Sequence, residues 1–515
     1  MLQILKGCFL YILLDTCLEK VGKSFLNSAI FRFFAFLLSK GRAHIGGSAI
    51  ARFFTRIADA VGAGMRNSLI IGRILKEDEA GRFKERGFVF RIYLAVLGLL
   101  RKVYRLLRLD RLMENSIFLR PWIWAISAMV LLPLLPTMAV LGLVMVSAFS
   151  LMAAMLHDES RTLHYSAVNK YVWLYMLAYG LATLTSVTVR GSLPVGLITI
   201  GFILFYHVLV SGIETKRQLR FLIGALAAVG AIVSLYGIYQ FIFPSHRATA
   251  WLDEGMFDFV RVYSTLGNPN VLGKYFLLVI PLAFAAVILS RSRVERFLLL
   301  AAAGLMCICL VLTYSRGAYL GILFAAAIFL ALLDRRFILP GILLAGLIFL
   351  LMPEAILQRF VSIGDMEDTS TSFRVFIWMG TLAMLQDYWF SGIGPGEAAW
   401  DMVYPAYSFH AIGTPHSHNL FLQITSDAGA PGLFLFLAVL YQYFKTTFAA
   451  IRRKIQGEQR ILVIASIAAV VGFLVQSMTD YTFYNYRVML FFWCVLAVGV
   501  IAVRYDTLGE GGRAS

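Results

Sequence analysis

Long stretches of apolar residues alternate with short polar segments along most of the chain. A helix that crosses a bilayer needs about 20 mainly apolar residues, and the chain supplies such stretches repeatedly from Pro121 onward. We therefore predict an all-α polytopic membrane protein with about twelve transmembrane helices, the first two forming a tight hairpin broken near Pro133 and Pro136. The predicted spans are 122–137, 138–156, 171–189, 194–211, 221–243, 270–290, 297–313, 317–333, 337–352, 432–449, 461–477 and 488–503.

The first 120 residues have a different pattern, in which apolar clusters alternate with Arg and Lys, as in Val103–Arg108. They hold 21 Lys and Arg against nine Asp and Glu. Amphipathic helices with basic polar faces bind the surface of a membrane, so we predict that residues 1–120 form a basic cytoplasmic and interfacial segment. The alternative is a cytosolic helical domain with a core of its own.

The composition supports the membrane class, because 60% of the residues are apolar and only 15% are charged. Soluble domains carry about a quarter charged residues, so a soluble enzyme, a disordered chain and a collagen-like fibre are excluded. The net charge of +17 could indicate nucleic acid, but beside a membrane body it favours membrane lipids and no nucleic acid. None of the five cysteines lies in a predicted external loop, and we expect no disulfide.

Short basic loops define the expected orientation, because Lys and Arg gather on the cytoplasmic side of membrane proteins. This rule places both termini in the cytoplasm and makes two long loops external, at about 244–269 and 353–431. The second is rich in Trp and other aromatic residues, which argues against disorder. The predicted parts are the segment 1–120, a transmembrane domain at 121–505 that includes the external loop 353–431, and a cytoplasmic tail at 506–515.

Several arginines lie where positive charge is unfavourable, at the external ends of predicted spans. Arg261 and Arg316 are surrounded by hydroxyl, amide and small residues, unlike the aliphatic surroundings of an arginine that reaches for lipid phosphate. Guanidinium groups bind phosphate oxygens in bidentate fashion. Together with Arg374 in the external loop, they are our candidates for binding a diphosphate.

The external loop also contains three histidines, of which His416 and His418 lie in the string Thr414–Leu420. Histidine is the usual general base near neutral pH, and we favour a catalytic or substrate-orienting role for His418, with His416 in support. Structural hydrogen bonding is the main alternative. A zinc site is less favoured, because no Cys, Asp or Glu stands near at ligand spacing.

Two further strings in the loop have simpler interpretations. The acidic run Asp365–Asp368 could suggest a metal-assisted transferase, but it is more typical of a solvated turn. The glycine-rich run Ser391–Gly396 follows no strand and lacks dinucleotide-binding spacing, so it predicts a tight turn. We expect neither a metal nor a cofactor.

Residues 120–505 resemble the O-antigen ligase family, which includes related polymerases. Four strings in order carry the resemblance: Thr265–Asn270; Thr313–Gly317; Phe373–Trp378 with Ser391–Gly396; and His418–Asn419 followed by Gly429 and Gly432. The resemblance implies a fold similar to membrane-embedded lipid-linked glycosyltransferases (the GT-C-like class).

The resemblance also implies glycan transfer from undecaprenyl diphosphate at the outer face of a bacterial cytoplasmic membrane, without a metal. The acceptor would be a lipid-anchored sugar in a ligase and another carrier-linked glycan in a polymerase. Arg261, Arg316 and Arg374 would balance the charge of the leaving diphosphate. His418 would accept or orient the proton of the acceptor hydroxyl, and attack opposite the leaving group would invert the anomeric centre.

Other assignments stay open at this stage. His416 and Asn419 are candidates for the acceptor side, and Asn268 could bond a sugar or simply begin a helix, at about even odds. The sequence does not separate a ligase from a repeat-unit polymerase. A transporter or flippase is less favoured, because the predicted spans carry almost no mid-depth charges and no visible repeat.

Overall fold

The structure is a computed structural model that describes residues 88–243, 261–350, 369–453 and 455–507. The described residues are helical and contain no strand. The segment 1–87, the loop 244–260, the acidic run Asp365–Asp368 and the tail from 508 lie outside them. The principal helices are α7 (Phe88–Leu106), α8 (Leu109–Leu112), α9 (Pro121–Leu131), α10 (Thr137–His157), α11 (Ala167–Leu184), α12 (Val189–Gly212), α13 (Lys216–Ile242), α14 (Pro269–Leu289), α15 (Arg293–Val311), α16 (Arg316–Leu333), α17 (Ile338–Leu350), α19 (Thr369–Tyr388), α20 (Glu397–Val403), α21 (Leu420–Arg452), α22 (Gly457–Ser477) and α23 (Tyr486–Thr507). Short 3-10 turns, among them η7 (Phe409–Ala411) and η8 (Thr482–Tyr484), connect some of them.

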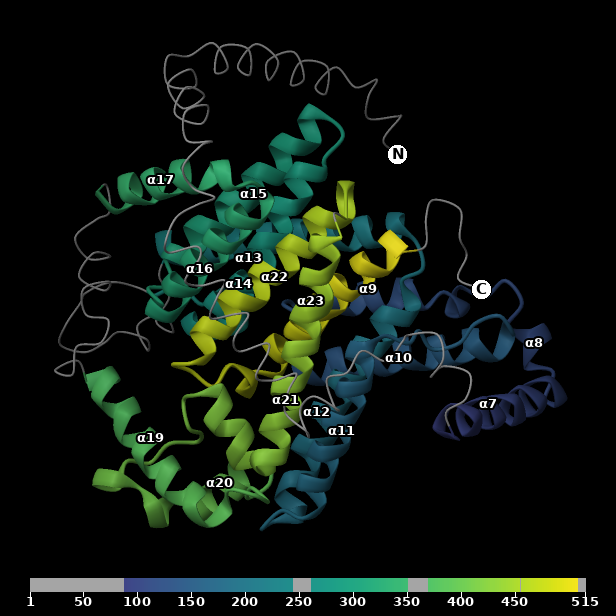
Figure 1. Cartoon of the computed structure of the whole chain (residues 1–515), viewed down its shortest axis with the longest axis horizontal. Helices are drawn as coiled ribbons and strands as arrows, with labels where there is room; N and C mark the ends of the chain where they lie inside the picture. The colour runs from purple at the N-terminus through teal and green to yellow at the C-terminus, as the bar shows by residue number, and fades with distance from the viewer. Residues whose placement is uncertain (1–87, 244–260, 351–368, 454, 508–515) are drawn as a thin grey trace.

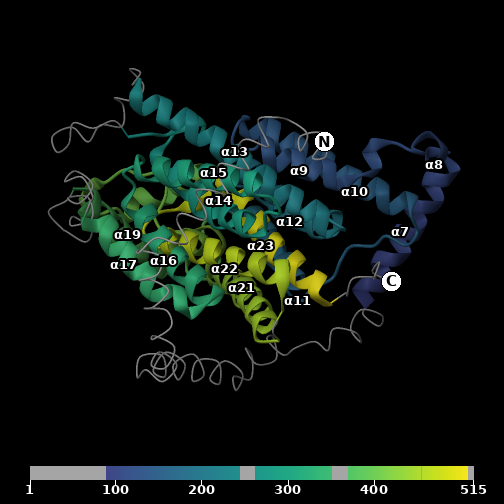
Figure 2. The same ribbon diagram turned by 90° about the horizontal axis from the view of Figure 1, so that it is seen from above.

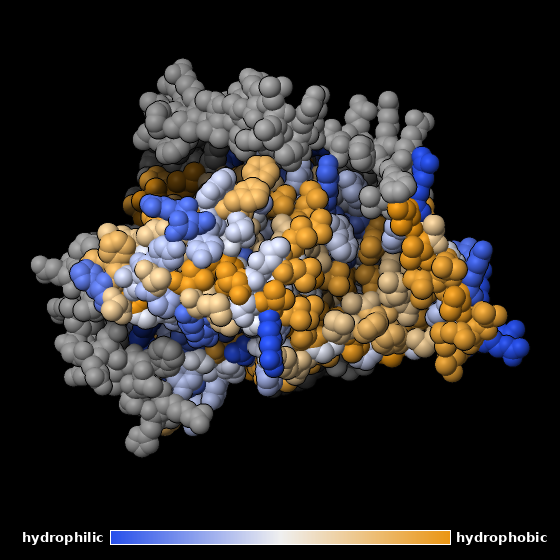
Figure 3. All heavy atoms as spheres, turned by 90° about the horizontal axis from the view of Figure 1, so that it is seen from below, coloured by the Kyte–Doolittle hydropathy of each residue, from blue (hydrophilic) through white to orange (hydrophobic). Residues whose placement is uncertain are grey.

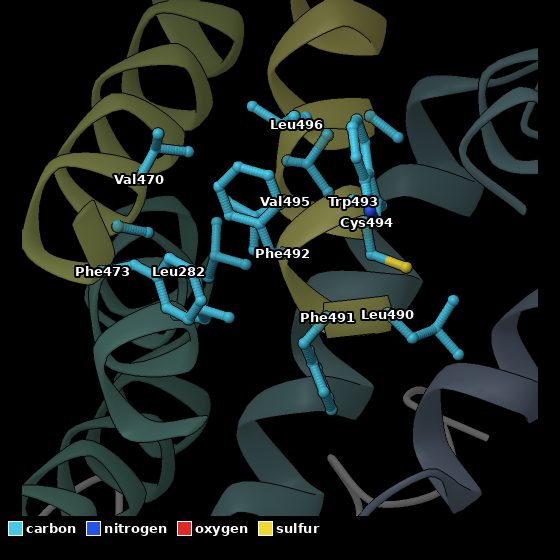
Figure 4. Packing of buried hydrophobic residues seen from close by; sticks show 14 of the residues in the cluster. Leu282, Val470, Phe473, Leu490, Phe491, Phe492, Trp493, Cys494, Val495 and Leu496 are labelled. Carbon is cyan, nitrogen blue, oxygen red and sulfur yellow. The ribbon is translucent and has the colours of Figure 1, made fainter. Parts of the chain in front are cut away.

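Three helices form the centre of the bundle. The apolar windows of α14, α23 and α22 are 89%, 83% and 72% buried, respectively, whereas that of α16 is 28% buried. Figures 1 and 2 show these three surrounded by the other helices, and Figure 4 shows Leu282 of α14 facing Phe473 of α22 and the aromatic side chains of α23. Lipid tails are as apolar as these side chains, so close packing rather than escape from water holds such a bundle together.

Glycines bring α16 and α22 unusually close together. A Cβ atom on Gly321 of α16 would lie 2.6 Å from the carbonyl oxygen of Gly472, and one on Gly472 would lie 2.7 Å from that of Gly321. Small residues at a helix interface allow two backbones to approach in this way. The contact holds the first turn of α16, which begins with Arg316, beside the end of α22.

Nine helices in the described part of the chain are long and apolar enough to cross a membrane. The predicted count of twelve is therefore not confirmed, although each of the twelve predicted spans overlaps a helix. Helix α9 has only 11 residues because the chain turns at Pro133 and Pro136, and α17 has 13. At about 1.5 Å per residue neither helix alone is as long as a bilayer of about 30 Å is thick, so a spanning segment there must include the residues next to the helix. Helix α11 has 18 residues but carries Asn169, Lys170 and three tyrosines, which lower its mean hydropathy.

The predicted loop 353–431 is largely helical where the structure describes it. Helix α21 begins at Leu420, twelve residues before the predicted span at 432, and α19 and α20 precede it. These two helices have a small apolar cluster of their own, in which Ile377 and Met384 pack with Trp400 and Tyr404. Figure 1 shows α19 and α20 together at one side of the bundle, with α7 and α8 at the other, and Figure 2 likewise shows α19 on the side opposite to α7 and α8.

Candidate active site

Several helix ends meet at one end of the bundle. The amide nitrogen of Asn419, just before α21, donates to the carbonyl of Met478, just after α22, at 2.8 Å. The guanidinium of Arg487, at the start of α23, donates to the carbonyls of Thr265 and Leu266, just before α14. Because successive spans reverse direction, segments far apart in the chain come together here, and they carry most of the residues selected from the sequence.

A buried ion pair lies at the centre of this end. The Nζ of Lys274 lies 2.7 Å from Oδ2 of Asp480, and the lysine side chain is 0% exposed. The ammonium also lies 4.4 Å from the ring centroid of Tyr484. A buried charge is tolerated only with a partner, so Lys274 in α14 requires the carboxylate that follows α22. Burial acts to raise the pKa of Asp480. The charge and close polar contact of Lys274 and those of His418 together outweigh this effect and hold the pKa well below its usual range.

His418 adjoins the same carboxylate. Its Nδ1 lies 3.7 Å from Oδ1 of Asp480, within ion-pair distance, and its side chain is 26% exposed. The backbone of His418 has a φ of 50°, a left-handed conformation that is uncommon outside glycine and asparagine. Such strain often accompanies a functional site. His418 is thus partly open to solvent while one ring nitrogen faces a carboxylate kept ionised.

His416 supports His418 from the inside. Its ring stacks on Tyr484, with 5.2 Å between centroids, and lies 4.3 Å from the ring of His418. Its Nδ1 accepts the backbone N–H of His418 at 3.3 Å. Burial, reinforced by the neighbouring His418, lowers the pKa of His416 to about 3, so His416 is neutral at physiological pH. The neutral His416 ring accepts the backbone N–H of His418 and so helps to fix the conformation of residues 416–418.

The three predicted arginines reach this region from different elements. Arg261 donates through Nε to the carbonyl of Thr313 and through Nη2 to Oδ1 of Asn270, both at 3.1 Å. Arg316 begins α16, and the next residue, Gly317, packs against Gln476 and Thr479, directly before Asp480. Arg374 lies on α19, close enough to act electrostatically on Lys274.

The two asparagines act as helix caps. Oδ1 of Asn268 accepts the backbone N–H groups of Asn270 and Val271 at the start of α14. Oδ1 of Asn419 accepts those of Phe421 and Leu422 at the start of α21. Of the two alternatives for Asn268, the structure favours the helix start, since its oxygen already satisfies backbone donors that the helix leaves unpaired.

A second layer of hydrogen bonds holds the histidine loop in place. The backbone N–H of Ser417 donates to Oε1 of Gln423 at 2.8 Å, and Nε2 of Gln423 donates to Oδ1 of Asp427 at 2.9 Å. The Tyr179 hydroxyl of α11 donates to Oδ2 of Asp427 at 2.9 Å. These groups are buried, so each bond is stronger than it would be in water. This series of hydrogen bonds links the backbone between His416 and His418 to α21 and α11.

The glycine-rich run predicted as a turn packs against a break in α21. Ala428 and Gly429 have non-helical backbone angles, Gly429 with a φ of 65°. The break frees the carbonyls of Ser426 and Asp427, which accept N–H groups from Ile393 and Gly394 at 2.7 and 3.2 Å. Gly392, Gly394 and Gly396 all have positive φ values, which confirms the predicted turn.

Replacing Gly429 by alanine is expected to destabilise the protein by more than about 1 kcal/mol, because the backbone angle disfavours a side chain and the new Cβ would lie 1.8 Å from the carbonyl oxygen of Phe390. Thermal unfolding of the detergent-solubilised protein measures this. Gly142→Ala in α10, where a Cβ meets nothing within 4 Å, is the matched control and should be neutral or slightly stabilising. Equal unfolding temperatures for the two variants would contradict a close approach at Gly429.

Sequence reasoning missed Asp480 and its pairing with Lys274. The sequence contains enough information to predict this pair. A lysine within an apolar span needs a partner of opposite charge, and Asp480 is the acidic residue of the short segment between the last two predicted spans. His410, in contrast, lies exposed on η7 and packs against Phe376. In the described ranges no three His, Cys, Asp and Glu side chains are grouped as a metal site requires.

Comparison with known protein families gives one match. Residues 301–437 match the model of the O-antigen ligase family. The matched segment runs from α15 into α21 and contains Arg316, Arg374, His416, His418 and Asn419. No curated protein matches the chain. The matched segment thus holds part of the cluster, and Arg261, Lys274 and Asp480 join it from outside.

Proposed function

The domain at residues 301–437 assigns this chain to the O-antigen ligase family, and from that premise we propose that it is an inverting, metal-independent membrane glycosyltransferase. It transfers a glycan from undecaprenyl diphosphate to a hydroxyl of a lipid-anchored or glycan acceptor. The observation that carries the proposal is the row Lys274–Asp480–His418 at the helix ends that also hold Arg261 and Arg316.

Each member of the row has a role in this reaction. Lys274 keeps Asp480 ionised, and Asp480 faces Nδ1 of His418. A carboxylate in this position favours a proton on Nδ1, which leaves Nε2 as the base for the acceptor hydroxyl. The acceptor oxygen forms the new bond to the anomeric carbon while the bond to the diphosphate oxygen breaks. The hydroxyl proton passes to Nε2 of His418.

The arginines would stabilise the leaving diphosphate. Negative charge develops on it as the glycosidic bond forms, and fixed guanidinium groups match phosphate oxygens without reorganisation. Arg316 starts α16 and Arg261 is anchored on Thr313 and Asn270, so both are held by helix ends. Arg374 would complete the set from α19.

The topology that we propose has twelve spans, a GT-C-like arrangement, both termini in the cytoplasm and the site outside. Its support is the distribution of basic residues. Arg291, just after α14, and Arg293 and Arg296, in the first turn of α15, lie at the opposite end of α14 from Lys274. Since short basic loops face the cytoplasm, the end that carries His418 faces outward, where carrier-linked glycans are joined.

The glycans of a strain that lacks the protein distinguish the candidate reactions. Loss of a ligase leaves completed polymer on its lipid carrier, whereas loss of a repeat-unit polymerase leaves single repeat units. A transfer assay with purified protein in detergent, where no sealed compartment exists, tests the transporter alternative, because a transporter yields no product. Absence of product from an otherwise folded protein would overturn the proposal.

Arg316→Ala is expected to lower the rate of transfer roughly 10- to 150-fold, the value of one charge-assisted hydrogen bond of about 1.5–3 kcal/mol. Arg316→Lys should recover only part of this, because lysine keeps the charge but loses the bidentate geometry. The assay is transfer by membranes with equal amounts of each variant. If Arg316→Ala retains full activity, Arg316 does not bind the diphosphate.

A further inference from the structure

A polar cavity lies at the end of the bundle opposite to His418. It has a volume of about 230 Å³, several times the roughly 30 Å³ that a water molecule occupies in the liquid. Its polar lining consists of Arg120, His157, Asp158 and Arg161, together with the amide of Asn115 and the hydroxyl of Ser116. The cavity lies between the end of α10 and the segment that leads into α9.

The two arginines of the cavity keep hydrogen-bonding capacity that the described part of the chain does not use. Arg161 pairs with Glu214 at 2.9 Å and with Asp158 at 3.6 Å, yet its Nη1 is buried and bonds no group of the described chain. Arg120 forms no ion pair with any residue that the structure describes. An anion with several oxygen atoms would supply the missing acceptors.

Helix α7 is fastened beside this cavity. Arg101 of α7 donates to the carbonyls of Met155, Asp158, Glu159 and Arg161, at and beyond the end of α10, at distances of 3.0 to 3.3 Å. The ring of Tyr104 meets that of His157, a lining residue, with 6.4 Å between centroids. The position of α7 is therefore fixed relative to the cavity.

The outward side of α7 is apolar. Val96, Leu99, Val103 and Leu106 follow helical spacing and are 50%, 63%, 44% and 81% exposed. Arg91, Lys102 and Arg105 occupy the neighbouring face. At the end of the molecule where Figure 1 places α7 and α8, Figure 3 shows hydrophobic side chains bordered by hydrophilic ones.

This pattern is typical of a helix that lies in the plane of a membrane, with its apolar stripe among acyl chains and its cations at the level of the phosphates. The cavity beside it then lies at headgroup depth. We propose that this cavity binds the headgroup of an anionic phospholipid, with Arg120 and Arg161 on the phosphate, Asn115 and Ser116 on polar headgroup atoms, and the acyl chains along the stripe of α7.

The test uses the full-length protein in detergent, with thermal unfolding followed as lipid is added. Dioleoyl phosphatidylglycerol should raise the unfolding temperature, whereas dioleoyl phosphatidylcholine and inorganic phosphate should not. Arg120→Gln should weaken the apparent affinity for phosphatidylglycerol at least about tenfold. This variant removes no ion pair of the described chain, so folding should be preserved. Native mass spectrometry of the retained lipid gives an independent readout.

The matched control is Arg217→Gln, an exposed arginine of the same end that does not line the cavity. It changes the net charge equally and should bind phosphatidylglycerol like the wild type. If both variants lose affinity for phosphatidylglycerol equally, general attraction to the charged surface explains the binding and the proposal is overturned. An equal response to inorganic phosphate would overturn the lipid assignment.

Discussion

Replacing His418 by alanine is expected to reduce glycan transfer by about 10²- to 10⁴-fold, the range that a positioned general base contributes. The loss should appear in the catalytic rate rather than in the amount of protein, because the side chain is partly exposed and forms no hydrogen bond from its Nδ1 in the described chain. Transfer measured with purified protein and a carrier-linked donor reports the effect directly.

His410→Ala provides the matched control for this experiment. His410 lies in the same sequence region, but it is exposed on η7 and packs against Phe376 instead of Asp480. Its replacement should leave transfer within about twofold of the wild type, since surface changes usually have small effects. If His418→Ala retains wild-type activity, or if both variants lose it equally, His418 is not the base.

The second large effect concerns stability. Lys274→Met is expected to lower the free energy of unfolding by about 3–5 kcal/mol, because removing one member of a buried pair leaves the other charge without a partner. Asp480 would then keep only the 3.7 Å contact with His418. The abundance of the variant in membranes and its unfolding in detergent both measure the loss.

The double variant Lys274→Met with Asp480→Asn isolates the cause. Removing both charges abolishes the unpaired carboxylate, so the double variant should be more stable than Lys274→Met alone. If it is no more stable, the two side chains are not energetically coupled.

The pH dependence of stability has a defined sign. The pKa of Asp480 is lower in the folded protein than its ordinary value of 3.8. Its contribution is therefore complete above that value and is lost as the pH falls below it towards the folded pKa. At physiological pH the pair is at full strength, which fits a role in holding Asp480 ionised beside His418.

The cluster extends beyond the segment that matches the ligase family. His418 and Arg316 lie within residues 301–437, whereas the ion pair that supports His418 comes from α14 and from the segment after α22. The second layer, from Ser417 through Gln423 to Asp427 and Tyr179, likewise reaches α11. The matched segment therefore depends on helices before and after it for the geometry of its histidine loop.

The sequence by itself determined the class of the protein and most of the candidate residues. Apolar runs specify helices because a backbone in lipid must satisfy its own hydrogen bonds, and each predicted span overlaps a helix. Arg261 and Arg316 were selected because their neighbours are unlike those of arginines that reach for lipid phosphate, and His418 because histidine is the usual general base near neutral pH. Asn268 and Asn419 precede helices at positions where local cap chemistry can be read directly.

Only the tertiary structure decided which of these groups meet. Lys274 lies on α14 and Asp480 in the segment after α22, and the packing of α14 against α22 brings them together. No local sequence pattern predicts this contact. The break in α21 is likewise stabilised by the backbone N–H groups of residues 393 and 394, which donate to carbonyls of α21. The helical residues before the break could therefore not be predicted from hydropathy. Hydropathy and helix-capping residues are local properties of the sequence, whereas contacts between side chains of distant segments depend on how the helices pack.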